Sequence, residues 1–206
     1  MDLHVPYLQE RELRSRAEDF LREHHPSKTL PVPIEEIVEF RLGLDVVPTS
    51  GLMNGPRGIN GYLSADRTTI YIDDALFRSA LNRYRFTLAH EVGHLVLHGE
   101  LYRSFRTEDE WKRFREDLAA HVISRAEYQA NVFAGLILVP PADMAALLPG
   151  VQKALSAQVL DEAPDFDLRA EAFWAYVAEE LAPRFEVSPT TVRIRLEADG
   201  LWRGGA

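Results

Sequence analysis

Residues 77–98 carry two rows of side chains at helical spacing, and neither row suits exposure to water. Projected at about 100° per residue, one side collects apolar residues: Phe77, Leu81, Tyr84, Leu88, Val92, Leu95 and Val96. The opposite side collects ligand-type side chains and one leucine: His90, Glu91, His94, Leu97 and His98. An exposed helix face would instead carry mainly charged and polar residues. The segment is therefore predicted to form a helix that packs on both sides inside a domain.

Within this segment, the sequence HEVGH places two histidines one helical turn apart, so both imidazoles point the same way. At this spacing His90 and His94 can reach one Zn²⁺ at about 2.0–2.1 Å. Glu91 is rotated by about 100° from His90, so it is expected beside the metal, where it can accept a proton from water activated there. The chain has no cysteine, which excludes thiolate ligands. Because this short pattern also occurs by chance, the metal hypothesis needs a third ligand.

Catalytic zinc sites take three protein ligands, and the histidine segment does not supply the third. One extended protease pattern would place glycine at position 97 and histidine at position 100, where this chain has Leu97 and Glu100. His98 continues the four-residue series, but three rings over two turns would span about 12 Å, which is too long for one ion. His98 is therefore predicted to be a neighbour of the site or a helix-end residue.

The best candidate for the third ligand is Glu127, on a second predicted helix after His94. One side of that helix collects mainly small residues around it: Glu127, Ala130, Asn131, Ala134 and Leu138. The alanines would let the two helices approach closely, and Asn131 could hydrogen-bond a ligand imidazole. Alternatively, Glu127 is an ordinary solvated acid, and His121 is then the fallback ligand.

Two stretches resemble the ImmA/IrrE metallopeptidase-like family: RFTLAHEVGHLVLH (85–98) and EYQANVFAGLILVP (127–140). The preceding GINGYLSADRTTIYID (58–73) is also similar, and the resemblance covers roughly residues 30–142. The departures are slight, with Val92 and Ile137 where leucine is common. The resemblance implies a zincin fold with a fixed set of site residues. In it His90, His94 and Glu127 bind zinc, and Glu91 is the catalytic acid/base.

Together, the resemblance and the residue patterns predict an α+β fold in two parts. A zincin-like peptidase domain is expected over residues 1–148, with a small antiparallel sheet packed on the histidine helix and the Glu127 helix. A helical region follows over 149–206. Strands are expected at 44–48 and on both sides of a turn at 64–66. Helices are expected at about 7–23, 34–40, 77–98, 108–123 (opened by a Thr107–Glu110 capping box), 125–138, 141–160, 168–185 and 189–199.

The net charge and the distribution of apolar residues restrict where the protein is expected in the cell and what it is expected to bind. The net charge of −9 over 206 residues argues against non-specific nucleic-acid binding. The sequence shows no signal-peptide pattern and no run of about 18 apolar residues, so a cytoplasmic protein without a membrane span is expected. The resemblance implies Zn²⁺, with another divalent metal such as Mn²⁺ possible. It also implies a protein substrate, a helix-turn-helix repressor whose cleavage derepresses stress-response or mobile-element genes. No oligomeric state is predicted.

The last two predicted helices have the pattern of a helix-turn-helix, with a turn at Glu186–Val187 and an N-cap at Ser188. The final helix carries residues that could face DNA: Thr190, Thr191, Arg193 and Arg195. From Leu181 to Arg203, however, arginines and acidic residues are nearly balanced, which is a poor electrostatic footprint for DNA. The alternative is a helical hairpin packed against the peptidase domain, and this alternative is favoured.

Three functional classes therefore remain: a zinc endopeptidase, which is favoured, a regulator that binds without cutting, and a DNA-binding transcription factor. For the endopeptidase, residues Thr68–Ile72 are expected to form an exposed edge strand that holds the substrate by strand addition. Three residues are candidates by type for stabilising the oxyanion: His98, His121 and Tyr128.

Overall fold

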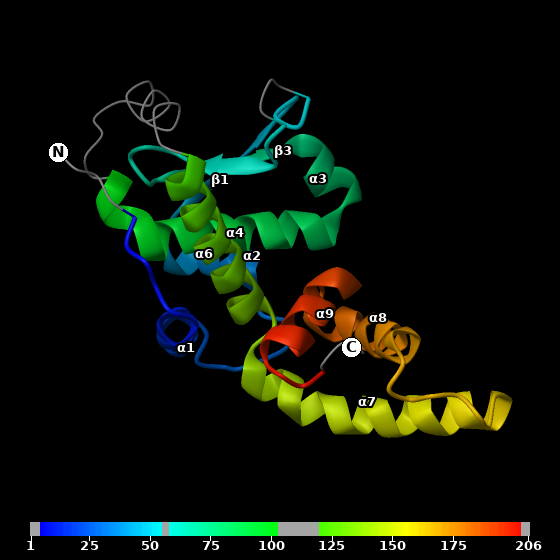
Figure 1. The fold of residues 1–206 in the computed structure, drawn as a ribbon. Helices are drawn as coiled ribbons and strands as arrows, with labels where there is room; N and C mark the ends of the chain where they lie inside the picture. The colour runs from blue at the N-terminus through cyan, green and yellow to red at the C-terminus, as the bar shows by residue number, and fades with distance from the viewer. Residues whose placement is uncertain (1–4, 55–57, 103–119, 203–206) are drawn as a thin grey trace.

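The computed structural model describes residues 5–54, 58–102 and 120–202, without the side chains of residues 101, 102, 120 and 121. Figure 1 shows a small sheet at one edge of the molecule, with α4 and α6 beneath it and the C-terminal helices α7, α8 and α9 at the opposite end. The N-terminal elements are α1 (Glu10–His24), α2 (Ile34–Glu36), a π-helical turn η1 (Ile37–Arg41), β1 (Asp45–Thr49), β2 (Gly61–Leu63), β3 (Thr69–Asp73) and α3 (Asp74–Ser79). Then follow α4 (Leu81–Tyr102), α6 (Ala120–Leu138), α7 (Pro141–Glu162), α8 (Glu171–Phe185) and α9 (Pro189–Ala198). The predicted α+β class is confirmed.

The sheet is mixed rather than antiparallel, which corrects the prediction. β2 and β3 form the expected antiparallel pair around a turn that Asp66 stabilises by accepting hydrogen bonds from the backbone and hydroxyl of Thr68. β1 pairs with the other side of β3 in parallel, from Asp45 opposite Thr69 to Thr49 opposite Asp73. The strand order is therefore β1-β3-β2. β3 is the central strand, so residues 68–72 cannot offer a free edge to a substrate, and that prediction is wrong.

The helix predicted over residues 77–98 is two helices. The Asp73 side chain caps α3 by accepting from the backbone of Ala75, and α3 ends at Ser79, with the non-helical Ala80 between it and α4. Around this break, Phe77 and Leu81 are 59% and 54% exposed, whereas Leu88 and Val92 are fully buried as expected. The apolar row is thus fully part of the core only at Tyr84, Leu88 and Val92, in α4.

The segments predicted as 108–123 and 125–138 also differ from the structure. Residues 120–138 form one continuous helix, α6, without a break near residue 124. The predicted capping box at Thr107 and Glu110 lies outside the described residues. α6 packs across α4 and against α1, where the rings of Phe20 and Phe133 meet edge to face with centroids 5.7 Å apart. α4 is thereby covered on its histidine side, as the sequence predicts.

α4 and α6 approach each other closely at Gly93 and Ala130. A Cβ atom at Gly93 would lie 3.1 Å from both the Cα and the carbonyl oxygen of Ala130. Both atoms belong to the backbone, so no side-chain rotation could relieve the contact. The small residues on α6 therefore do allow the predicted close approach. On α4, the missing side chain of the glycine inside HEVGH is equally needed for it.

The C-terminal helices pack on the preceding part of the chain and share one apolar core with it. α8 and α9 form the expected hairpin, with Glu186 in the left-handed conformation (φ 50°) and Ser188 accepting from the backbone of Thr191. Below them in Figure 1, α7 extends along the edge of the molecule. The division at residues 148 and 149 stays a prediction.

Arg195, predicted as a possible DNA contact, is turned into the protein. Its side chain is 3% exposed and pairs with Asp199, which also binds Arg14 of α1 at 2.8 Å. Its aliphatic part lies over Gly135 of α6, where a Cβ would be only 3.1 Å from Arg195 Cδ. Arg193 remains at the surface in ion pairs with Glu171 and Glu197. Both arginines among the four proposed DNA-facing residues are thus engaged in ion pairs within the protein.

Among the described helices, none is both long and apolar enough to cross a membrane alone. α6 and α7 would satisfy the length and composition only as a pair bent by 58°.

Candidate metal centre

Two helices bring the predicted ligands together. His90 and His94 project from one side of α4, and Glu127 projects toward them from α6. The His90 and His94 Nε2 atoms are 3.0 Å apart, His90 Nε2 is 3.1 Å from Glu127 Oε2, and His94 Nε2 is 3.6 Å from Glu127 Oε1. Among the described residues, these three form a group able to hold a metal ion, with one ligand atom each, all within 4.8 Å of one another.

The spacing of these atoms fits a zinc ion. Ligands at about 2.0–2.1 Å in a tetrahedron are about 3.3 Å from one another. The three separations of 3.0, 3.1 and 3.6 Å, of which the last two go to different oxygens of Glu127, lie on both sides of that value. Two imidazoles and one carboxylate are also a donor set that zinc uses in catalytic sites. The residues therefore fit the metal that the sequence predicts, and the metal's identity stays a prediction.

The ligand rings are oriented by hydrogen bonds on the side facing away from the centre. His90 Nδ1 lies 2.9 Å from Asn131 Oδ1, so the ring donates to the amide and turns Nε2 toward Glu127. Asn131 thus occupies the place predicted for it, one turn after Glu127. In the neutral ring, a proton held on Nδ1 leaves the Nε2 lone pair of His90 to serve as a ligand.

Glu127 and His90 also bias each other's charge. Burial disfavours the ionised carboxylate, yet its contacts with the imidazoles of His90 and His94 outweigh it and hold the pKa of Glu127 well below its usual range. Burial disfavours the charged form of His90 as well and so acts to lower its pKa. The hydrogen bond and charge of Glu127, together with the charge of Glu91, outweigh burial and raise the pKa of His90 overall. A carboxylate that stays ionised beside two imidazoles is suited to a divalent cation.

Glu91 is buried, at 5% exposure, between α4 and the sheet. Its Oε2 accepts a hydrogen bond of 2.9 Å from the backbone N–H of Leu63 in β2. Within the described part of the chain, Oε1 makes no such bond. One oxygen is therefore anchored to the sheet while the other stays available for proton transfer, which suits the predicted acid/base role.

The three oxyanion candidates are placed differently. His98 is 4% exposed and bonded to His94 and Gln129, so it lies inside the protein behind the ligands. Burial, followed by the neighbouring His94, lowers the pKa of His98 to about 4. Tyr128 points outward, at 62% exposure. The side chain of His121, which was also the fallback ligand, lies outside the described residues.

Four contributors to the centre were not singled out from the sequence. Leu63 anchors Glu91 through its backbone, which no side-chain pattern reveals. Gly61 is required because a Cβ there would lie 2.7 Å from the Tyr71 carbonyl. Gln129 and the carbonyl of Pro6 hold His98. The position of Gln129 in EYQAN, two residues after the ligand, was the only signal present in the sequence.

We expect Gly93→Ala to disturb the centre from a distance, because the added methyl group would push α6, with Glu127, away from α4. The net loss should be about 1–3 kcal/mol, despite a helix-propensity gain of up to about 1 kcal/mol. Metal affinity should fall as well. Gly150→Ala is the matched control, since nothing lies within 4 Å of its Cβ in α7. Equal stabilities for the two variants in denaturant titrations would contradict the close-packing argument.

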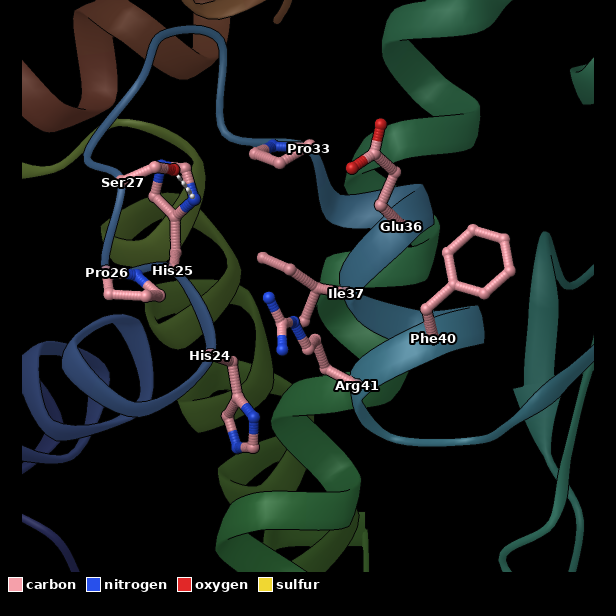
Figure 2. A pocket seen from close by; sticks show the side chains of 9 residues that line it. All are labelled: His24, His25, Pro26, Ser27, Pro33, Glu36, Ile37, Phe40 and Arg41. Carbon is pink, nitrogen blue, oxygen red and sulfur yellow. Dashed lines mark hydrogen bonds between the residues drawn. The ribbon is translucent and has the colours of Figure 1, made fainter.

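A separate pocket of about 280 Å³ lies between the loop after α1 and the α2–η1 segment (Figure 2). It is lined by His24, His25, Pro26, Ser27, Pro33, Glu36, Ile37, Phe40 and Arg41. This lining includes neither the three clustered ligands nor Glu91. The pocket is therefore distinct from the candidate metal centre.

Comparison with protein families decides the relationship. The family model of the IrrE N-terminal-like domain (Peptidase_M78) matches residues 59–197, which is well over half of the chain. The chain belongs to this family. The match includes both ligand helices, so the resemblance noted on HEVGH and EYQAN is confirmed for this IrrE N-terminal-like protein. It also continues through α8 and α9, beyond the predicted domain boundary.

A solved structure with a similar fold is a Mycobacterium tuberculosis transcriptional regulator. The two are 18% identical with a TM-score of 0.50, over 93% of this chain and 48% of that one. The IrrE N-terminal-like chain thus spans about half the length of the regulator, and a likeness at this identity concerns the fold alone. A comparison with curated proteins gives no significant match.

Proposed function

We propose that this protein is a zinc-dependent endopeptidase that cleaves a helix-turn-helix repressor and so derepresses genes. The observation that carries the proposal is the convergence of His90, His94 and Glu127, with Glu91 beside them on α4. Membership of a peptidase family agrees with it. The choice of a repressor as substrate rests on the resemblance seen in the sequence and is the finer part of the proposal.

In this mechanism the protein's own groups have separate tasks. A zinc ion held by the His–His–Glu group would supply a Lewis acid for the scissile carbonyl. Glu91 would take a proton from the attacking water and return it to the leaving amine. The hydrogen bond from Leu63 N–H to Oε2 would keep the carboxylate in place during both transfers.

The alternative of a regulator that binds without cutting is favoured by no contact in the described residues. A protein that only binds has no need of an ionised Glu127 between two imidazoles, nor of a buried acid next to them. The DNA-binding alternative loses support because Arg195 is buried and Arg193 is ion-paired.

The test uses small helix-turn-helix proteins encoded beside this protein, incubated with it in the presence of Zn²⁺ or a chelator. We expect one of them to be cut at a discrete bond with zinc, and the fragments to disappear with chelator in intact-mass spectra. A peptide library run in parallel tests for endopeptidase activity as such. Complex formation without fragments would favour the non-cleaving regulator, and equal cutting of unrelated peptides would overturn the repressor specificity.

A further inference from the structure

A chain of four polar groups runs from the backbone of the N-terminal segment to a predicted metal ligand. The Pro6 carbonyl accepts from Gln129 Nε2 at 2.8 Å, and Gln129 Oε1 lies 2.9 Å from His98 Nε2. His98 Nδ1 lies 3.1 Å from His94 Nδ1. His94, His98 and Gln129 are all buried, so water does not compete freely for these bonds.

Donors and acceptors in this series of hydrogen bonds can be assigned in one consistent direction. A carbonyl oxygen only accepts, so the amide nitrogen of Gln129 must face Pro6 and its oxygen must face His98. His98 Nε2 must then carry the proton that it donates to Gln129. In the neutral ring, His98 Nδ1 is left as an acceptor, and the proton between the two Nδ1 atoms belongs to His94.

The consequence falls on the opposite nitrogen of His94. With its proton fixed on Nδ1, His94 has a lone pair on Nε2, the atom that lies 3.0 Å from His90 Nε2 and 3.6 Å from Glu127. The tautomer needed for metal binding is therefore set before any ion arrives. Asn131 does the same for His90 through one bond, whereas His94 depends on a relay.

We propose that His98 is a positioning residue that fixes the tautomer and ring orientation of His94 through its Nδ1 acceptor. This inference rests on the proposed metal function. The essential feature is an acceptor atom at the place of His98 Nδ1. The bulk of the ring and its contact with Gln129 are secondary.

Two amide variants separate these features. His98→Asn places its Oδ1 where Nδ1 was, so it keeps the acceptor for His94 but loses the contact with Gln129. His98→Gln places its amide where Nε2 was, so it keeps the contact with Gln129 and more of the volume but loses the acceptor. A merely structural role predicts that the Gln variant is the better tolerated, and the positioning role predicts the reverse.

The measurement is the affinity for Zn²⁺ by competition with a chromogenic chelator, with the Co²⁺ absorption spectrum as a second readout. We expect His98→Gln to weaken binding by about 10–100-fold and His98→Asn by less than about threefold. Only the Gln variant should change the Co²⁺ spectrum. Thermal unfolding of the metal-free proteins shows whether each variant folds.

The outcomes distinguish this inference from the proposed function. Wild-type affinity in both variants, equal losses, or a larger loss in His98→Asn would each overturn the role of His98 while the metal centre stands. If the wild-type protein bound no metal, and His90→Ala therefore changed nothing, the proposed function itself would fail and the role of His98 with it.

Discussion

Replacing Glu91 by glutamine should strongly slow cleavage while the metal centre stays intact. The amide oxygen can still accept the hydrogen bond from Leu63 N–H, so the side chain keeps its place. It cannot take a proton, and loss of general acid–base catalysis typically costs about 10²–10⁴-fold. We therefore expect the rate of substrate cleavage to fall at least about 100-fold, with Zn²⁺ affinity unchanged within experimental error.

Two controls separate this effect from others. Glu127→Gln should lose metal as well as activity, because the carboxylate that approaches both histidines is neutralised. Glu179→Gln, an exposed change on α8, should alter neither. If the Glu91→Gln protein cleaved its substrate at the wild-type rate, Glu91 would not be the acid/base. If it lost metal, the separation between ligand and base would be wrong.

The candidate site was predictable from the sequence because helical spacing converts directly into geometry. Residues four apart share a helix face, so the side-by-side placement of His90 and His94 follows from HEVGH alone. Glu127 required a second inference, the close approach of two helices, for which the alanines of α6 were the signal. The structure brings these three residues together, although their action on a metal stays a prediction.

The sheet was less predictable because strand pairing is a non-local choice. The turn at residues 64–66 indicates that β2 and β3 are neighbours, but nothing in DVVPT specifies which side of β3 it joins or in which direction. The break at Ala80 was missed for a different reason. An apolar row at helical spacing continues across it, and the exposure of Phe77 shows that spacing alone does not establish burial.

The series of hydrogen bonds from Pro6 to His94 could not be predicted from residue spacing in the sequence. It uses a backbone carbonyl at Pro6 and an amide on another helix, residues 123 positions apart. His98 was separated from the ligands by an argument about length alone, and that argument could not say what His98 does instead. Side-chain partners across helices become visible only when the helices are placed.

Arg195, which the helix-turn-helix pattern suggested as a DNA contact, is instead buried in the protein. Its guanidinium and that of Arg14 both contact Asp199 Oδ1, and the side chains of Arg195 and Asp199 are 3% and 6% exposed. Asp199 is therefore the counter-charge that makes burial of Arg195 tolerable. This contact joins α9 to α1 and, through Arg195 over Gly135, to α6.

Asp199→Asn should accordingly destabilise the protein by about 3 kcal/mol, since removing one partner of a buried pair leaves an uncompensated charge. Loss of one partner of a buried pair costs about 3–5 kcal/mol, and we expect the low end because Arg14 is partly exposed and can turn to solvent. Asp19→Asn is the matched control, since its pair with Arg22 is exposed on both sides and should contribute less than about 1 kcal/mol. Urea unfolding measures both, and equal losses would mean that the buried network does not hold the C-terminal helices in place. A loss confined to Asp199→Asn, with Zn²⁺ affinity retained in the folded protein, would assign α9 to stability and leave the chemistry to α4 and α6.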